Sequence, residues 1–502
     1  MKKLIFIFSF LICISLSAQN PNYAEDVAGI LYNSCTSCHH SGGIAPFSLM
    51  TYQEAANSVS QMVVAIIAGE MPPWPPDTNY QRYSHERILT LSDINTLLDW
   101  NNNGTPQGNM SLAPVTPNYI PGAILPNPNF TLSLPTYTPS AQNEDEYVCF
   151  RLSTNFSTAK YIKAVEIIPG NPGIVHHVLA YIDTGSGGAT ITQDCMGVEG
   201  NLFAGYTPGA EPTIFPNGAN VKMGVKLPAG ADIIVQMHYP KGSAGMVDST
   251  KINFFFYPSG TTGVREVYTD PLLGLWTFYI PANATPTFTT QFPPNNGVLT
   301  SDFSILSVFP HMHLIGEEIT SYAVTPSNDT IPFERINNWD FEWQGFYNFK
   351  NILKVPAGSR MYAIAKYNNT SSNPNNPNNP PQMVIPGVAT TDEMFLVFFQ
   401  YLPYQQGDEN LNLDSLLSVG MGEKLQFNKL CIFPNPTEDK FQVQLPFKGE
   451  LSLKILNTEG KTVKEMQVNP YDWISLKDLP NGTYLCFMEK DKTIYSAKII
   501  KQ

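Results

Sequence analysis

The sequence predicts a multidomain protein with a small all-α domain, a long all-β region and a small β unit at its C-terminal end. Up to about residue 110, apolar residues recur at helical spacing. From about residue 129 to 410, short apolar runs instead alternate with Pro, Gly and Asn turns, a pattern typical of strands. A Pro-rich linker at residues 111–128 and a second linker at 412–427 separate these regions.

Composition excludes several classes of protein. The 502 residues include 29 Lys and Arg against 42 Asp and Glu, a net charge of -13. A nucleic-acid binder needs a basic face for phosphates, so no nucleic-acid partner is expected. Only 14% of the residues are charged, which argues against a coiled coil or charge-rich disorder.

The first residues have the pattern of an export signal. Two lysines precede an apolar run from Leu4 to Leu16, and the small-residue exit Ser17-Ala18-Gln19 follows. We therefore expect a signal peptide over residues 1–18 and export through the periplasm into an oxidising space. No apolar run reaches the roughly 18 residues of a membrane helix, so we expect no transmembrane segment and a secreted or cell-surface protein.

Residues 19–110 form the predicted helical domain, which contains the motif Cys35-Thr36-Ser37-Cys38-His39. In such a C-x-x-C-H motif, the thiols of Cys35 and Cys38 add to the vinyl groups of one haem c, and His39 ligates the iron. The alternative is half of a zinc site, but only His40 and His85 remain in this domain as further ligands. One helix of this domain is expected to begin near Ser92, a candidate N-cap.

Met71 is the candidate sixth ligand of the haem iron. It opens the run Met71-Pro72-Pro73-Trp74-Pro75-Pro76, whose prolines fix an extended loop that can present a thioether. Met50 and Met62 compete, although both lie in sequence that reads as helix or core, and simple packing of Met71 is the remaining alternative. The whole segment resembles a small class I cytochrome c domain.

The β region contains five histidines, and they fall into three places: His176-His177, His238, and His311-x-His313. On a strand, His311 and His313 would point to the same face and could chelate one ion. His176 and His177 would face opposite sides, so both can bind one ion only at a bulge or with unusual ring orientation. Imidazoles suit Cu, Zn or Fe. The isolated His238, taken alone, could instead be a core histidine.

The order of these motifs resembles the copper type II, ascorbate-dependent monooxygenase family, which includes peptidylglycine α-hydroxylating monooxygenase and dopamine β-monooxygenase. The matching segments are His176 to Leu179, Gln236 to Tyr239, His311 to Gly316 and Asp392 to Met394. The resemblance covers roughly residues 118–410. It implies two jelly-roll-like β domains, residues 129–265 and 266–411, each with one copper ion.

The resemblance also assigns the ligands. The electron-transfer copper would be held by His176, His177 and His238. The oxygen-binding copper would be held by His311, His313 and Met394, which are the expected catalytic residues for hydroxylation of a substrate C–H bond. A thioether ligand favours Cu(I) and argues against zinc.

Three positions depart from the family pattern. The peptide-hydroxylating member has an Arg two residues before the His-x-His pair, where this chain has Phe309. It has an Asn and a Tyr after the ligating Met, where this chain has Leu396 and Phe398. The carboxylate clamp of that member is therefore missing, and we expect a substrate that is not a C-terminal glycine peptide and is less polar than one.

The function expected from the sequence is an exported copper monooxygenase that uses O2 on a small substrate. The fused haem would deliver electrons to the copper site of His176, His177 and His238, kept close by the Pro-rich linker. An external reductant or redox protein would supply electrons to the haem. Two alternatives stay open: a domain fusion with separate roles, and a non-catalytic haem- and copper-carrying electron-transfer or metal-binding protein. A zinc hydrolase would leave Met394 unexplained.

Residues 428–502 resemble the type A sorting domain of the type IX secretion system of Bacteroidetes. The matching segments are Ile432 to Thr437, Asn481 to Tyr484 and Lys498 to Lys501. The resemblance implies a small β-sandwich that is recognised by the type IX machinery and then removed. The alternative is an accessory binding sandwich.

The other cysteines of the mature chain fall into two sequence regions. Their proximity predicts the disulfides Cys149–Cys195 and Cys431–Cys486. Free buried thiols are the alternative for each pair.

Overall fold

A computed structural model describes residues 20–67, 70–117, 119, 123–185, 187–193, 195, 198, 200–218, 220–416, 426–444, 451–457, 462–490 and 493–502. The signal peptide expected at residues 1–18 lies outside these residues. Two compact units, Met1–Val419 and Gly420–Gln502, make up the chain, and each is described by itself. Among the described residues, no helix is both long and apolar enough to cross a membrane.

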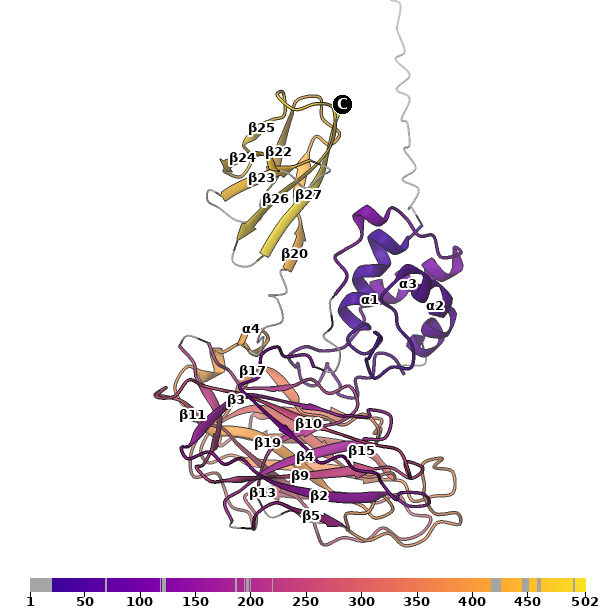
Figure 1. Cartoon of the computed structure of the whole chain (residues 1–502), viewed down its shortest axis with the longest axis vertical. Coiled ribbons are helices and arrows are strands. Elements are labelled where there is room, and N and C mark those ends of the chain that lie inside the picture. The colour runs from indigo at the N-terminus through magenta and orange to yellow at the C-terminus, as the bar shows by residue number, and fades with distance from the viewer. Residues whose placement is uncertain are drawn as a thin grey trace, which may run out of the picture. The chain divides into compact units, whose positions relative to one another are not determined.

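The helical domain contains η1 (Tyr23–Val27), α1 (Ala28–Ser34), α2 (Tyr52–Ile67), α3 (Leu91–Asn102) and η2 (Met110–Leu112). Figure 1 shows the helices α1, α2 and α3 close together. Their apolar core includes Leu31, Leu97 and Trp100, each 0% exposed. The N-cap of α3 is Thr90 and not Ser92, so that sequence prediction was wrong. The Thr90 hydroxyl accepts the Asp93 N–H while the Asp93 carboxylate accepts the Thr90 N–H, a reciprocal pair that Ser92 cannot form.

The N-terminal β domain contains β1 (Phe130–Ser133), β2 (Glu146–Ser153), β3 (Lys160–Ile168), β4 (His177–Asp183), β5 (Thr190–Gln193), β6 (Asn201–Tyr206), β7 (Thr213–Ile214), β8 (Met223–Leu227), β9 (Asp232–Tyr239), β10 (Lys251–Phe256) and β11 (Arg265–Glu266). One sheet has the order β1-β10-β3-β8-β11, with β7 also paired to β3, and the other has the order β5-β2-β9-β4-β6. Buried side chains of both sheets, such as Phe150 and Phe254, form one core between them.

The C-terminal β domain contains β12 (Tyr268–Gly274), β13 (Thr287–Phe292), β14 (Phe303–His311), β15 (Gly316–Val324), β16 (Thr330–Ile336), β17 (Tyr347–Val355), β18 (Arg360–Tyr367) and β19 (Leu396–Pro403), followed by η3 (Asp408–Asn410) and α4 (Leu413–Leu416). Its sheets have the orders β12-β19-β14-β17 and β13-β18-β15-β16. Side chains of this domain, including Leu306, Ile352, Leu402 and Leu413 of α4, belong to the core of the N-terminal β domain. The two β domains therefore share apolar packing.

A segment of the helical domain, residues 73–87, lies on the C-terminal β domain, and we call it the strap. Tyr83 is 2% exposed within that domain's core, and its hydroxyl donates to the Phe333 carbonyl at 2.8 Å. The Asp77 N–H donates to the Arg335 carbonyl at 2.8 Å. The helical domain is thus attached by packing and hydrogen bonds as well as by the chain, whereas the sequence predicted a tether through residues 111–128 alone.

Part of the predicted Pro-rich linker also packs against the protein. Leu125 is 2% exposed and contacts the buried side chains of Ala164 and Phe255. Its N–H donates to the Glu166 carboxylate at 3.3 Å. This end of the linker is therefore docked on the N-terminal β domain.

The C-terminal unit contains β20 (Gln426–Lys429), β21 (Cys431–Phe433), β22 (Lys440–Gln444), β23 (Leu451–Leu456), β24 (Thr462–Val468), β25 (Trp473–Ser475), β26 (Gly482–Lys490) and β27 (Thr493–Lys501), shown in Figure 1. They form sheets of order β20-β27-β26-β23-β24 and β21-β22-β25 around a common core. Cys486 is a buried free thiol whose Sγ lies 3.4 Å from the Ala497 carbonyl. The predicted Cys431–Cys486 disulfide was therefore wrong, because Cys486 faces this core, where an apolar thiol packs well.

The N-terminal β domain does contain a disulfide. Cys149 of β2 and Cys195, which follows β5, are bonded with Cα atoms 5.6 Å apart. β2 lies between β5 and β9. The bond thus secures the edge of the sheet that carries His238.

Glu334 is a buried carboxyl group in β16. It is 0% exposed, and its Oε2 accepts the Ser321 hydroxyl, while its Oε1 has no partner among the described residues. Burial raises the pKa of Glu334 from 4.5 to about 8. The folded protein therefore keeps this proton at pH values where the unfolded chain has lost it.

Replacement of Tyr83 tests the strap. Tyr83→Ala should lower the free energy of unfolding by about 3–5 kcal/mol because it leaves a cavity in the core. Tyr83→Phe, which removes only the hydrogen bond to Phe333, should cost about 1–3 kcal/mol. Urea unfolding measures both. If Tyr83→Ala left stability unchanged, the strap would not be part of this core.

The Glu334 carboxyl should make stability fall as pH rises. Between pH 4.5 and about 8 the folded state binds more protons at this group than the unfolded state, so the free energy of unfolding decreases with pH. Glu334→Gln should remove this component and be more stable than wild type at pH 8 by roughly 3 kcal/mol. Denaturant unfolding at pH 5 and pH 8 checks it, with the half-exposed Glu318→Gln as control. Equal pH slopes for wild type and Glu334→Gln would contradict the expectation.

Candidate metal centres

Three histidines from two neighbouring strands converge on one point. His177 in β4 lies directly opposite His238 in β9, and His176 comes immediately before β4. The His176 N–H donates to the His238 carbonyl at 3.0 Å. Because His176 precedes the strand, it does not follow the strand's alternation of side chains, and all three rings point to the same place.

The geometry of these rings fits a metal ion. The three Nδ1 atoms lie 3.1, 3.2 and 3.3 Å from one another. The centre of such a triangle is about 1.9 Å from each corner, close to the roughly 2.0 Å of a metal–imidazole bond. Within the described part of the chain, this trio is the one convergent group of three His, Cys, Asp or Glu ligands.

Carboxylates orient two of these rings from behind. His238 Nε2 lies 3.0 Å from the Asp145 carboxylate, and His176 Nε2 lies 3.3 Å from the Glu342 carboxylate. The contact between His176 and Glu342 is short enough for an ion pair, but its geometry does not meet that of a hydrogen bond. A carboxylate on the far ring nitrogen fixes the tautomer that leaves the Nδ1 lone pair for a metal.

The second pair, His311 and His313, is oriented in the opposite sense. His311 ends β14 and His313 lies just beyond it, with ring centroids 5.1 Å apart. His311 Nδ1 lies 2.6 Å from Gln344 Oε1, and His313 Nδ1 lies 3.1 Å from the Asp392 carbonyl. If each Nδ1 carries the proton for these acceptors, the Nε2 atoms hold the lone pairs.

Glu393 joins this pair to Met394. It is 0% exposed, and its Oε2 accepts the N–H groups of His313 and Met394 at 2.9 and 3.0 Å. Its Oε1 accepts the Ile315 N–H at 3.0 Å. One buried side chain thus holds the segment after β14 against the segment before β19, which places His313 and the half-buried Met394 side by side.

Burial favours the neutral form of four of these histidines, because it lowers their pKa values. It lowers the pKa of His311 to about 4 and that of His313 to about 3, and the neighbouring histidines add to the effect. It also lowers the pKa of His177 and of His238, where Asp145 opposes the shift. Neutral rings have the free lone pair that a metal requires.

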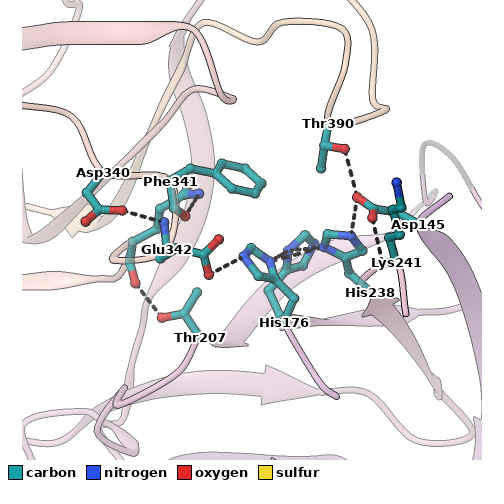
Figure 2. Close-up of polar contacts among 11 residues, drawn as sticks. Asp145, His176, Thr207, His238, Lys241, Asp340, Phe341, Glu342 and Thr390 are labelled. Carbon is teal, nitrogen blue, oxygen red and sulfur yellow. Dashed lines mark hydrogen bonds and ion pairs between the residues drawn. The ribbon is translucent and has the colours of Figure 1, made fainter. Parts of the chain in front are cut away.

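The two centres are connected across the β domains. Figure 2 shows the Glu342 carboxylate directed at His176 on one side, and Asp145 between His238 and Thr390 on the other. The Phe341 ring stacks on His176 with centroids 4.9 Å apart and meets the edge of His313 at 5.9 Å. A single phenyl ring therefore spans the space between the two sites.

A cavity of about 350 Å³ opens beside both centres. His176, His177, His311, His313 and Met394 line it. Much of the remaining wall is aromatic or aliphatic. This part of the wall includes Tyr147, Trp276, Phe309, Trp343, Phe346, Leu396 and Phe398. The three positions that depart from the family pattern thus lie together and make the cavity apolar.

The C-x-x-C-H motif contains two free thiols and a histidine with one ring nitrogen available. Cys35 and Cys38 are both free and partly exposed. His39 Nδ1 lies 3.1 Å from the Phe47 carbonyl, which leaves Nε2 for a metal. Met71 is 36% exposed and directly precedes the strap. His40 contacts the Thr36 carbonyl and stacks on Tyr119, so it is not gathered into a zinc site with these thiols.

Several residues of the site were not found by sequence reasoning. No recognised motif contains Asp145, Phe341, Glu342 or Gln344, and each of them is distant in sequence from the histidine ring that it contacts. Glu393 lies in the matching segment Asp392 to Met394, but nothing in the sequence assigned it a role. The one signal in the sequence for Glu393 was its position directly before Met394, the candidate ligand.

Comparison with known proteins identifies two regions of the chain. Residues 278–416 match the family model of the copper type II ascorbate-dependent monooxygenase, C-terminal domain. Residues 431–502 match the secretion system C-terminal sorting domain, which indicates secretion or cell-surface localisation by the type IX system. Neither match includes the helical domain.

A curated relative agrees with the first match. DBH-like monooxygenase protein 2 from Mus musculus is 22% identical over 256 residues, which are 47% of this chain and 39% of the relative. The chain therefore spans less than half the length of that relative. The predicted resemblance to copper monooxygenases is confirmed by both findings.

Solved structures add little. The BSP domain of a biofilm-associated protein has 9% identity, covering 74% of this chain and 81% of its own, with a TM-score of 0.15. The VP2 subviral particle of infectious bursal disease virus has 11% identity, covering 59% and 86%, with a TM-score of 0.15. Such scores do not indicate a common fold.

Glu393 offers a selective test of the Met394 centre. Burial raises the pKa of Glu393 to about 8. Above that pH, Glu393→Gln keeps the size of the side chain, but one of its two acceptor oxygens becomes a donor facing backbone N–H groups, at a cost of roughly 1–3 kcal/mol. The chain should then bind one copper ion tightly in place of two, as metal analysis after dialysis would measure. Glu317→Gln, a partly exposed change in the same domain, should still bind two. Two tightly bound ions in Glu393→Gln would contradict the role assigned to this carboxyl.

Proposed function

We propose that the protein is an exported copper monooxygenase that hydroxylates a C–H bond of a small substrate, because residues 278–416 match the family model of the copper type II ascorbate-dependent monooxygenase, C-terminal domain. The balanced reaction joins the substrate, O2, two electrons and two protons to give the alcohol and water. Copper bound at the two centres would supply the one-electron redox chemistry and the activation of O2.

The residues divide into two sets with different chemistry. His176, His177 and His238 would hold the electron-transfer copper in an all-nitrogen site. His311, His313 and Met394 would hold the oxygen-binding copper, where the thioether favours Cu(I) and the small number of ligands leaves a position open. Phe309 and Phe398 stack with centroids 5.6 Å apart and limit the access of water to that site.

One observation carries the proposal: His176 and His177 of the three-histidine cluster line the same cavity as His311, His313 and Met394. A protein that only stores copper or passes electrons has no need of a substrate-sized space between two different sites. The 350 Å³ cavity therefore favours an enzyme over the non-catalytic alternative.

The helical domain is proposed to hold one haem c and to provide electrons. Cys35 and Cys38 would bind it covalently, His39 would ligate the iron, and Met71 is the candidate sixth ligand. Gly209 lies close to Cys38, since a Cβ atom at position 209 would be 3.7 Å from Cys38 Sγ. The residues on either side of Gly209, Pro208 and Ala210, line the cavity. This proximity supports delivery of electrons to the copper centres, with an external reductant or redox protein as the source.

The export route is also a proposal. The sorting domain supports recognition by the type IX machinery. Passage through the periplasm after removal of residues 1–18, and later removal of the sorting domain, would follow from that route. The Cys149–Cys195 disulfide is consistent with an oxidising compartment.

Met394 provides the test of the proposed activity. The haem-loaded full chain should bind two copper ions and consume O2 when reductant is added, and Met394→Ala should lower the uptake by at least about 100-fold because its site loses the soft ligand. Met383→Ala, a 65% exposed methionine of the same domain, is the matched control and should behave as wild type. Uptake that does not depend on Met394, or a single bound copper in wild type, would refute the monooxygenase proposal.

A further inference from the structure

The strap places one arginine in the wall of the cavity that holds the metal centres. Arg87, which is half-buried, lines the cavity. Apart from the histidines, the charged side chains of its described lining are Arg87 and Glu211. Glu211 lies 3.2 Å from His85 Nδ1. Arg87 therefore carries the one permanent positive charge of the described cavity lining.

The guanidinium retains most of its hydrogen-bonding capacity. Its Nη1 donates to the Gly209 carbonyl at 3.0 Å, and its Cζ lies 5.9 Å from the Trp74 ring. Among the described residues, no carboxylate forms an ion pair with it. A guanidinium has five N–H donors in a planar fork that matches a carboxylate, so donors remain for a ligand.

Two neighbouring polar atoms of the strap are also unsatisfied. Ser84 is 6% exposed, and its Oγ has no partner within the described chain; the same holds for Trp74 Nε1. Both residues line the cavity with Arg87. Buried donors without partners are costly, and an acceptor bound at this wall would relieve that cost.

Contacts connect this wall to the Met394 centre. A Cβ atom on Gly209 would lie 3.3 Å from the Trp343 ring. The next residue, Gln344, accepts the Thr207 hydroxyl through its carbonyl and contacts His311 Nδ1 through its side chain at 2.6 Å. A molecule held at Arg87 would therefore extend along Trp343 toward His311.

We propose that Arg87 binds the carboxylate of a small, mainly apolar acid, which is the substrate of the monooxygenase proposed above. The single guanidinium balances one negative charge, so a monoanionic carboxylate fits better than a phosphate monoester, which carries nearly two charges at neutral pH. The aromatic wall receives the apolar body and leaves its far end beside Met394. The helical domain thereby supplies a specificity-determining residue to a cavity that the two β domains mostly line.

Isothermal titration calorimetry with two probes tests this proposal. The probes are 3-phenylpropanoate and its neutral analogue 3-phenylpropanamide, titrated into the haem- and copper-loaded full chain. The carboxylate should bind at least tenfold more tightly than the amide. In Arg87→Met this preference should disappear, whereas Arg87→Lys should retain part of it because the charge remains. No preference in wild type, or an unchanged preference in Arg87→Met, would overturn the proposal.

The amide and a second arginine serve as controls. Amide affinity should be unchanged in Arg87→Met, which shows that the cavity is intact. Arg82 belongs to the same strap but is 58% exposed and paired with Glu86 at 2.6 Å, so Arg82→Met should keep the preference for the carboxylate. Loss of the preference in Arg82→Met as well would mean that strap folding, and not the Arg87 charge, is responsible, and would overturn the proposal.

A third arm separates the substrate from the carboxylates of a haem. In Cys35→Ser/Cys38→Ser protein, which lacks covalent haem, the carboxylate probe should bind with the same affinity as in the loaded chain. Binding only in the haem-free protein would assign Arg87 to the haem and refute the substrate role. Probe binding is measured without turnover, so it can fail while O2 uptake persists, or persist while O2 uptake fails.

Discussion

The pairing of β4 with β9 is the constraint on which the metal chemistry depends. It sets His177 opposite His238 and lets His176, one residue before the strand, bond to the His238 backbone. A shift of one residue in this register would turn one of the facing rings to the other side of the sheet. The Cys149–Cys195 disulfide lies on the adjoining strands, and Gln236 of β9 donates to the Cys195 carbonyl at 2.8 Å, so the same edge is held by covalent and polar bonds.

The two centres are not independent of each other. Asp145 of the N-terminal β domain contacts both His238 and Thr390, and Thr390 precedes Met394 by a few residues in the C-terminal β domain. From the other side, Glu342 contacts His176. Glu342 thus contacts a candidate ligand of the other domain, and Asp145 holds the segment before Met394. The separation of the two sites is set by packing between the domains and not by a linker.

Through the strap, the fused helical domain also contributes to the structure of the β domains and their cavity. An electron-donating module needs only proximity, which a flexible linker provides. Here the segment carries Tyr83 into the core of the C-terminal β domain and Arg87 into the wall of the cavity. The helical domain therefore shapes the space in which a substrate would bind, in addition to any role in redox chemistry.

The sequence by itself indicated the candidate ligands, the C-x-x-C-H motif and the C-terminal sorting domain, because residue type and spacing carry that chemistry directly. It also indicated that residues 129–410 form strands, since their alternation is local. It misplaced the cap of α3 at Ser92 and paired Cys486 wrongly, because such details depend on competing local partners. Only the tertiary structure brought Asp145 to Thr390, 245 positions away, and Arg87 into the cavity. Contacts of this kind arise from packing between distant segments, which leaves no periodicity in the chain to be recognised.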